Sequence, residues 1–171
     1  MFIVQITNRY IQFKMKLSYT FLSIALALIM SSCGTTKQLA KTKYDARLAQ
    51  KLGADELGMK MYVLVILKTG DAKIEDKAVR DSLFRGHFAN INKLANEGKL
   101  VVAGPLEKNE NQYRGIFILD VKTFAEANLL LQNDPTISQG IFKAEMYEWY
   151  GSAALPVYMQ THKKIEKTKI E

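Results

Sequence analysis

Apolar residues follow two different periods along the middle of the chain, and each change of period marks a predicted element. Residues 60–68 form an apolar run rich in Val, Leu and Ile, which predicts a strand. Between residues 75 and 97 apolar side chains recur at helical spacing, which predicts a helix that a following glycine ends. Residues 99–103 predict a second strand, and we expect Gly104-Pro105 to close it as a turn.

Two more strands and a second helix are predicted further along the chain. Residues 113–120 predict the third strand. Thr123 and Glu126 have the spacing of a capping box, which predicts the start of a helix, and Asp134-Pro135 ends it. Residues 141–150 alternate apolar and polar positions and predict the fourth strand. The order β-α-β-β-α-β predicts an α+β, ferredoxin-like fold, with an antiparallel four-stranded sheet and both helices on one face.

The first predicted strand is apolar on both of its faces. Val63, Val65 and Leu67 alternate with Leu64 and Ile66, so one set points away from the helices. An uncovered apolar sheet face usually marks an interface. The sequence therefore predicts a homodimer that packs sheet against sheet.

The net charge of +7 comes from the ends of the chain. Residues 60–151 hold twelve basic and twelve acidic residues, so the predicted domain is neutral. The positive excess lies in residues 1–32, 33–59 and 152–171. A nucleic-acid-binding domain concentrates positive charge on its folded face. Nucleic acid is therefore excluded as a partner.

Residues 1–32 have the pattern of an export leader. Lys16 precedes the apolar run 21–30, which is shorter than the about 20 residues that span a bilayer. Two serines then precede Cys33, the only cysteine, in an order that resembles the lipid-attachment signal of bacterial lipoproteins. We expect Cys33 to carry lipid and to anchor the exported chain, on the outer membrane facing the periplasm. An uncleaved signal anchor is the alternative, and Met15 is an alternative translation start.

The remaining sequence divides into three parts. Residues 33–58 form a polar tether, in which residues 44–58 have the pattern of a short helix ended by Gly53 or Gly58. Residues 59–151 form the predicted domain. Residues 152–171 form a charged tail, of which we expect residues 157–171 to be a solvated helix or a frayed end.

Few residues of the domain carry recognisable chemistry. One cysteine and two histidines argue against a metal site. His87 lies on the apolar stripe of the first predicted helix, where a structural histidine is the more common role and a general base is the alternative. Asp134 before a proline has the pattern of a helix N-cap. No phosphate-binding glycine loop and no nucleophilic Ser or Cys elbow is present.

Taken in order, these residues resemble the YCII-related domain family. That family has a helical histidine, a G-(K/R)-L-x-x-A-G-P strand, a glycine in the third strand and a D-P-x(4)-G segment. The matching residues here are Arg85-Gly-His87-Phe88, the segment 97–105 (EGKLVVAGP), Arg114-Gly115, and Asp134-Pro135 with Gly140. The resemblance covers about residues 59–151.

The resemblance implies a dimeric α+β barrel with a pocket between helix and sheet. It also implies an active-site histidine–aspartate pair, which falls on His87 and Asp134. Arg85, Gly104, Pro105 and Arg114 are the candidate substrate-binding residues, although a solvated arginine is the ordinary case. The family's arginine lies three residues before the histidine, whereas Arg85 lies two before it.

Three functions remain open at this stage. The first is an acid–base enzyme of isomerase, lyase or dehydrochlorinase type, in which His87 held by Asp134 acts on a small molecule. The second is a non-catalytic, periplasm-facing dimer that binds a small-molecule ligand or a partner. The third is haem binding through His87, which no other residue supports, so we expect no cofactor.

Overall fold

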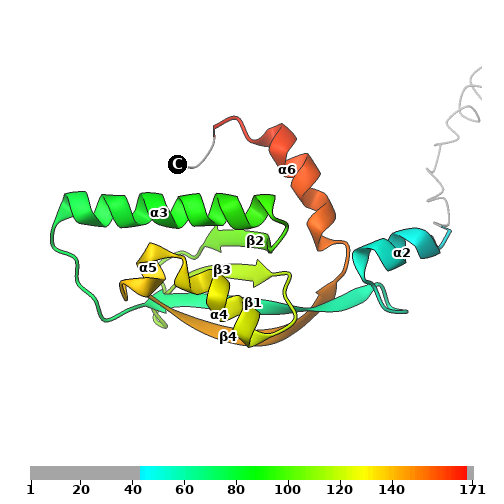
Figure 1. Cartoon of the computed structure of the whole chain (residues 1–171), viewed down its shortest axis with the longest axis horizontal. Helices are drawn as coiled ribbons and strands as arrows, with labels where there is room; N and C mark the ends of the chain where they lie inside the picture. Colours follow the sequence, from blue (N-terminus) through cyan, green and yellow to red (C-terminus); the bar gives the residue numbers. More distant parts are fainter. Residues whose placement is uncertain (1–42, 169–171) are drawn as a thin grey trace, which may run out of the picture. The chain divides into compact units, whose positions relative to one another are not determined.

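Four antiparallel strands form a sheet in the order β2-β3-β1-β4 (Figure 1). The structure is a computed structural model that describes residues 43–168. The strands are β1 (Met59–Thr69), β2 (Leu100–Pro105), β3 (Tyr113–Leu119) and β4 (Phe142–Ser152). The helices are α2 (Ala46–Leu52), α3 (Lys77–Asn96), α4 (Phe124–Gln132), α5 (Pro135–Ser138), the 3-10 helix η1 (Leu155–Tyr158) and α6 (Met159–Ile165). The order and pairing confirm the predicted α+β, ferredoxin-like fold.

A single chain forms an open sheet, whose edges are β2 and β4. A barrel would require a second copy of the chain, so the dimeric barrel stays a prediction. In the described part of the chain, no helix is long and apolar enough to cross a membrane. The predicted leader and Cys33 lie outside the described residues. All the elements given above belong to one unit, Asp45–Glu171.

The predicted turn at Gly104-Pro105 is wrong. Both residues belong to β2, where Gly104 pairs with Ile116 and Pro105 pairs with Gly115. Proline has no N–H to donate to a strand ladder, but it is tolerated here because β2 lies at the sheet edge. The chain turns back only after this pair, and Gln112 adopts a left-handed backbone angle just before β3.

The main core lies between the sheet and the helices that cover one of its faces. Alternation along β1 points Val63, Val65 and Leu67 into this core. Leu119 of β3 and Ala127 of α4 are fully buried beside them. The capping box predicted for α4 forms in part: the Glu126 N–H donates to the Thr123 hydroxyl. The Glu126 side chain accepts from the Lys122 N–H rather than from the N-cap residue itself.

The other sheet face carries a smaller apolar cluster. It is centred on Tyr62, Val101 and Ile118, against which Leu155 packs from the segment after β4. The Tyr158 hydroxyl of the same segment donates to the Val101 carbonyl on the edge strand β2, at 2.5 Å. The C-terminal segment therefore covers one end of this face, although the sequence predicted a solvated tail. Neither η1 nor α6 has a buried residue, so this part of the tail agrees with that prediction.

The helix predicted within the tether is present as α2. The Asp45 side chain accepts from the Leu48 N–H at its start, and Gly53 ends it with φ 70°. That left-handed angle is one that glycine adopts without strain. The helix buries no residue. A hydrogen bond from the Tyr150 hydroxyl to Asp55 joins the following loop to β4.

Helices α3 and α5 approach each other at Gly86 and Pro135. A Cβ atom on Gly86 would lie 2.5 Å from Cγ of Pro135. Because the proline ring is stiff and begins α5, a larger residue at position 86 would push the two helices apart. This contact places His87, the next residue of α3, close to Asp134, the residue before the proline.

We expect Gly86→Ala to lower the free energy of unfolding. At an ordinary helix position this change would stabilise by about 0.5–1 kcal/mol. Here the overlap with Pro135 is expected to cost about 1–3 kcal/mol, as overpacked sites do. Urea denaturation measures the change, and Ala89→Gly, at an exposed position of the same helix, is the control that should lose about 1 kcal/mol. A more stable Gly86→Ala variant would contradict the close contact.

Candidate functional site

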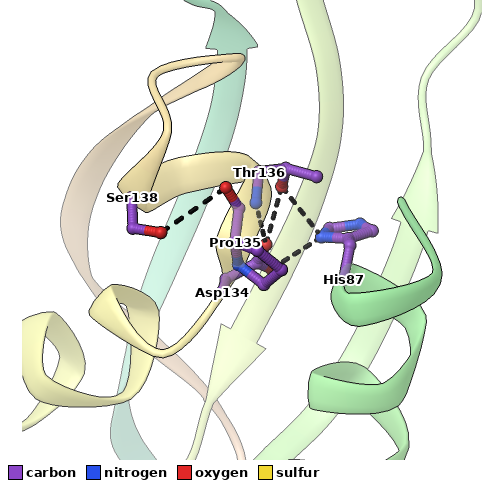
Figure 2. A network of polar contacts seen from close by, with 5 residues as sticks. All are labelled: His87, Asp134, Pro135, Thr136 and Ser138. Carbon is purple, nitrogen blue, oxygen red and sulfur yellow. Dashed lines mark hydrogen bonds and ion pairs between the residues drawn. The ribbon is translucent and has the colours of Figure 1, made fainter. Parts of the chain in front are cut away.

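His87 and Asp134 form a hydrogen-bonded pair between α3 and the start of α5 (Figure 2). His87 Nδ1 lies 2.6 Å from Asp134 Oδ2, and the aspartate is fully buried. Asp134 also has the N-cap role predicted from its proline, because it accepts from the Thr136 N–H at 2.9 Å. One carboxylate therefore both starts a helix and holds the histidine.

Thr136 completes the hydrogen bonding of this carboxylate. The Thr136 hydroxyl donates to Asp134 Oδ1 at 2.7 Å, and Thr136 Oγ1 itself lies 3.2 Å from His87 Nδ1 (Figure 2). Thr136 is fully buried. This residue was not among those predicted from the sequence. Its only signal is its place two residues after an N-cap aspartate, where its N–H is within reach of the cap.

The charge of Asp134 follows from these contacts. Burial by itself would raise the pKa of Asp134, but the hydrogen bonds from His87 and Thr136 outweigh burial and hold that pKa below its ordinary value. The carboxylate is therefore ionised at neutral pH and only accepts hydrogen bonds. It follows that His87 Nδ1 carries a proton, which it donates to Asp134. In the neutral ring the free lone pair is then on Nε2.

His87 contributes its ring to a cavity of about 460 Å³ between α3 and the sheet. The cavity is lined by Leu67, Phe84, His87, Phe88, Ile91, Ala103, Gly104, Pro105, Arg114, Gly115, Phe117 and Phe142. Nε2 has no hydrogen-bond partner among the described residues, and none of their buried side-chain polar atoms is unpaired. This nitrogen is therefore accessible, on the side of the ring that points away from Asp134 (Figure 2).

Four phenylalanine rings surround the imidazole. The ring centroids of Phe84, Phe88, Phe117 and Phe142 lie between 5.4 and 6.2 Å from that of His87. These residues lie in helices and strands that the sequence predicts, but none of them was among the predicted site residues. They come from α3, β3 and β4, so only the folded chain brings them together. They hold the imidazole in an apolar environment.

Three of the four predicted substrate-binding residues line the cavity. Gly104, Pro105 and Arg114 do, whereas Arg85 is exposed and does not. Two residues along an α-helix correspond to a rotation of about 200°, so Arg85 and His87 lie on opposite sides of α3. An arginine three residues before the histidine would lie on the same face. A role for Arg85 in substrate binding stays a prediction.

Arg114 reaches the cavity through an irregularity in β3. Leu67 pairs with Gly115, but the next residue of β1, Lys68, pairs with Tyr113, so Arg114 is an extra residue in the strand. A bulge of this kind re-aims a side chain. Strict alternation from Ile116 would place Arg114 on the open face of the sheet, the face opposite α3 and α4. Arg114 instead lines the cavity beside Gly115.

No group of three or more His, Cys, Asp or Glu side chains that could hold a metal ion occurs within residues 43–168. The other histidine, His162, lies on α6 and is exposed. The chemistry of the cavity therefore depends on one imidazole, one buried carboxylate and one guanidinium.

Comparison with known proteins agrees with the motifs. No curated protein matches the chain. Among solved structures, the chain is similar to 5-chloro-2-hydroxyhydroquinone dehydrochlorinase (TftG) from Burkholderia phenoliruptrix AC1100, in complex with 2,5-dihydroxybenzoquinone. The two share 19% identity with a TM-score of 0.39, over 51% of this chain and 92% of that one, and we draw no functional conclusion from a likeness at this level.

The YCII-related domain family matches residues 61–150, which are more than half of the 171 residues. The matched range contains every motif on which the resemblance was based, from the helical histidine to the D-P-x(4)-G segment. The chain belongs to the YCII-related domain family.

Proposed function

We propose that this chain is an acid–base enzyme acting on a small molecule, with His87 as the general base. The observation that carries the proposal is the 2.6 Å hydrogen bond between His87 Nδ1 and Asp134 Oδ2, made at the wall of a cavity. It leaves Nε2 as the accessible basic atom. The volume of about 460 Å³ is in the range of small-molecule sites, about 300–1,000 Å³.

The proposed step is the removal of a proton from a carbon next to a carbonyl group. The C–H bond breaks and its electron pair forms a C=C bond, the π pair of the carbonyl moves to oxygen to give an enolate, and the proton forms an N–H bond with Nε2 of His87. Asp134 stabilises the imidazolium that results, since its carboxylate is ionised and already bound to Nδ1. Return of the proton to another carbon isomerises the substrate, and loss of a leaving group from the enolate gives elimination.

We expect His87→Gln to lose proton transfer while keeping the fold. The assay follows exchange of hydrogen for deuterium next to the carbonyl of simple lactones and cyclic ketones in D₂O, by NMR. Removing a general base typically costs about 10²- to 10⁴-fold in rate. Asp134→Asn tests the pairing, because the neutral amide no longer selects the Nδ1–H form of the ring.

The chain has only two histidines, so His162 serves as an internal reference for that test. We expect the ¹⁵N signals of His87 to show a proton on Nδ1 in the parent and a mixture of tautomers in Asp134→Asn. Binding of a probe without any exchange would instead support the second candidate function, a non-catalytic binding module. Equal exchange rates in the parent and in His87→Gln would reject His87 as the base.

We also propose that the chain forms a homodimer through the sheet face opposite α3 and α4. Away from Leu155, this face carries the half-buried Ile66 and Ile116 and the exposed Tyr147. Beside them Lys68 and Glu145 form an ion pair of 2.9 Å. An apolar patch bordered by charges of both signs can pair with its own copy about a two-fold axis.

Ile116→Glu is expected to give a monomer, because it places a carboxylate in the centre of that interface. Leu129→Glu, at an exposed position of α4, is the matched control and should leave the dimer intact. Sedimentation equilibrium gives the masses, and circular dichroism verifies that both variants are folded. A monomeric parent chain would overturn the homodimer.

We propose, from the sequence alone, that the chain is exported and anchored by lipid at Cys33, on the outer membrane facing the periplasm. Two or more acyl chains anchor a protein stably, since each buried CH₂ contributes about 0.8 kcal/mol. We expect the parent to partition into the detergent phase of a Triton X-114 extract and Cys33→Ser to lack the lipid modification. Labelling with radioactive palmitate separates lipidation from an uncleaved signal anchor, which would partition likewise but remain unlabelled.

A further inference from the structure

We propose that the molecule taken by this cavity has a flat apolar body and one anionic oxygen group, a carboxylate or a phenolate, which Arg114 binds. The inference rests on the proposed function for the role of His87, but its own basis is the charge and shape of the cavity.

The cavity has one fixed charge. Of its twelve lining residues only Arg114 is permanently ionised, and none is an aspartate or a glutamate. The carboxylate of Asp134 is bound by His87 and Thr136 and is fully buried. A cation in this cavity would therefore be desolvated beside a guanidinium, without a free carboxylate to accept it. An anion would have a partner.

The guanidinium of Arg114 is oriented by one hydrogen bond and still has donor groups available for a ligand. Its Nε donates to the Thr69 hydroxyl at 2.6 Å, and no ion pair involving Arg114 is found among residues 43–168. Within residues 43–168 its two terminal nitrogens make no hydrogen bond or ion pair with the protein, so they are available as the planar fork that binds a carboxylate through two parallel hydrogen bonds. The β-bulge and Thr69 together determine where that fork lies, so Arg114 is oriented before a ligand arrives.

The rest of the wall selects the shape of the ligand's body. Phe84, Phe88, Phe117 and Phe142 surround the imidazole, and Leu67 and Ile91 complete the apolar lining. Aromatic side chains pack well against flat rings. In such a wall a single polar group oriented by one residue gives most of the specificity. The anion is thus expected to orient the molecule, and the apolar rings are expected to hold its body beside His87.

The test measures binding of benzoate and of benzamide, its neutral isostere, to the purified chain by isothermal titration calorimetry. We expect benzoate to bind more tightly than benzamide, and Arg114→Gln to weaken benzoate binding about 10- to 100-fold while leaving benzamide unchanged. Arg80→Gln is the matched control, since it removes an exposed arginine of α3 that does not line the cavity. Thr69→Val should weaken benzoate binding less than Arg114→Gln does, because Arg114 keeps its charge but loses the hydrogen bond that orients it.

One further probe, 4-nitrophenolate, separates the possible sources of the anion. Tighter binding of 4-nitrophenolate than of benzoate assigns the site to phenolates, and the reverse order assigns it to carboxylates. Circular dichroism verifies the fold of each variant. The proposal is overturned if neither anion binds, if benzamide binds as tightly as benzoate, or if Arg114→Gln behaves like Arg80→Gln.

The binding measurement does not depend on turnover, so the two proposals can fail separately. Binding of the anion through Arg114 without deuterium exchange rejects the acid–base function and keeps the ligand class. Exchange that depends on His87 without any preference for anions rejects the ligand class and keeps the acid–base function.

Discussion

The buried, ionised carboxylate of Asp134 is the constraint on which the rest of the site depends. A charge that is fully removed from water needs hydrogen-bond donors from several directions, and here they come from His87 and from both the N–H and the hydroxyl of Thr136. Leaving a buried hydrogen-bonding group without its partner typically costs about 1–3 kcal/mol, and more when the group is charged. The imidazole is therefore kept in one orientation by the same contacts that begin α5.

A single contact between α3 and α5 determines both how these helices pack and where the proposed base lies. Gly86 allows α3 to approach Pro135 closely, and the adjacent residues His87 and Asp134 meet as a result. The aromatic rings around the imidazole are part of the same wall, so the hydrophobic core extends to the edge of the cavity. The same residues therefore serve the packing of the core and the position of His87. A change in the spacing between α3 and α5 would affect both.

Periodicity in the sequence was sufficient for the strands, the helices and their order, because those patterns are local. The His87–Asp134 contact followed from the family motifs, since neither residue on its own distinguishes a structural role from a catalytic one. The predicted turn at Gly104-Pro105 failed because strand pairing is set by a distant segment, in this case β3. Helical geometry could have separated Arg85 from the site, since two residues on a helix lie on opposite sides.

Other features depend on register and could not be derived from the chain alone. Alternation assigns Arg114 to the open face of the sheet, and only the unequal pairing of β1 with β3 shows that a bulge turns it toward the cavity. The packing of Leu155 on the sheet face opposite α3 and α4 was likewise hidden, because the apolar segment 153–158 carries no local signal of the surface that it packs against. Both features depend on residues that are far apart in the sequence.

The crossing of the C-terminal segment makes the two ends of the open face unequal. Within residues 43–168, Leu155 packs at the end near Tyr62 and Val101, whereas the end that carries Ile66, Lys68 and Glu145 lies outside that cluster. Lys68 and Thr69 are consecutive residues of β1, and Thr69 holds Arg114. A second copy of the chain packed on this face would therefore lie toward one end of the sheet, next to the strand ends that orient the Arg114 guanidinium. The dimer contact and the residues that select the ligand would then lie at the same end of the sheet.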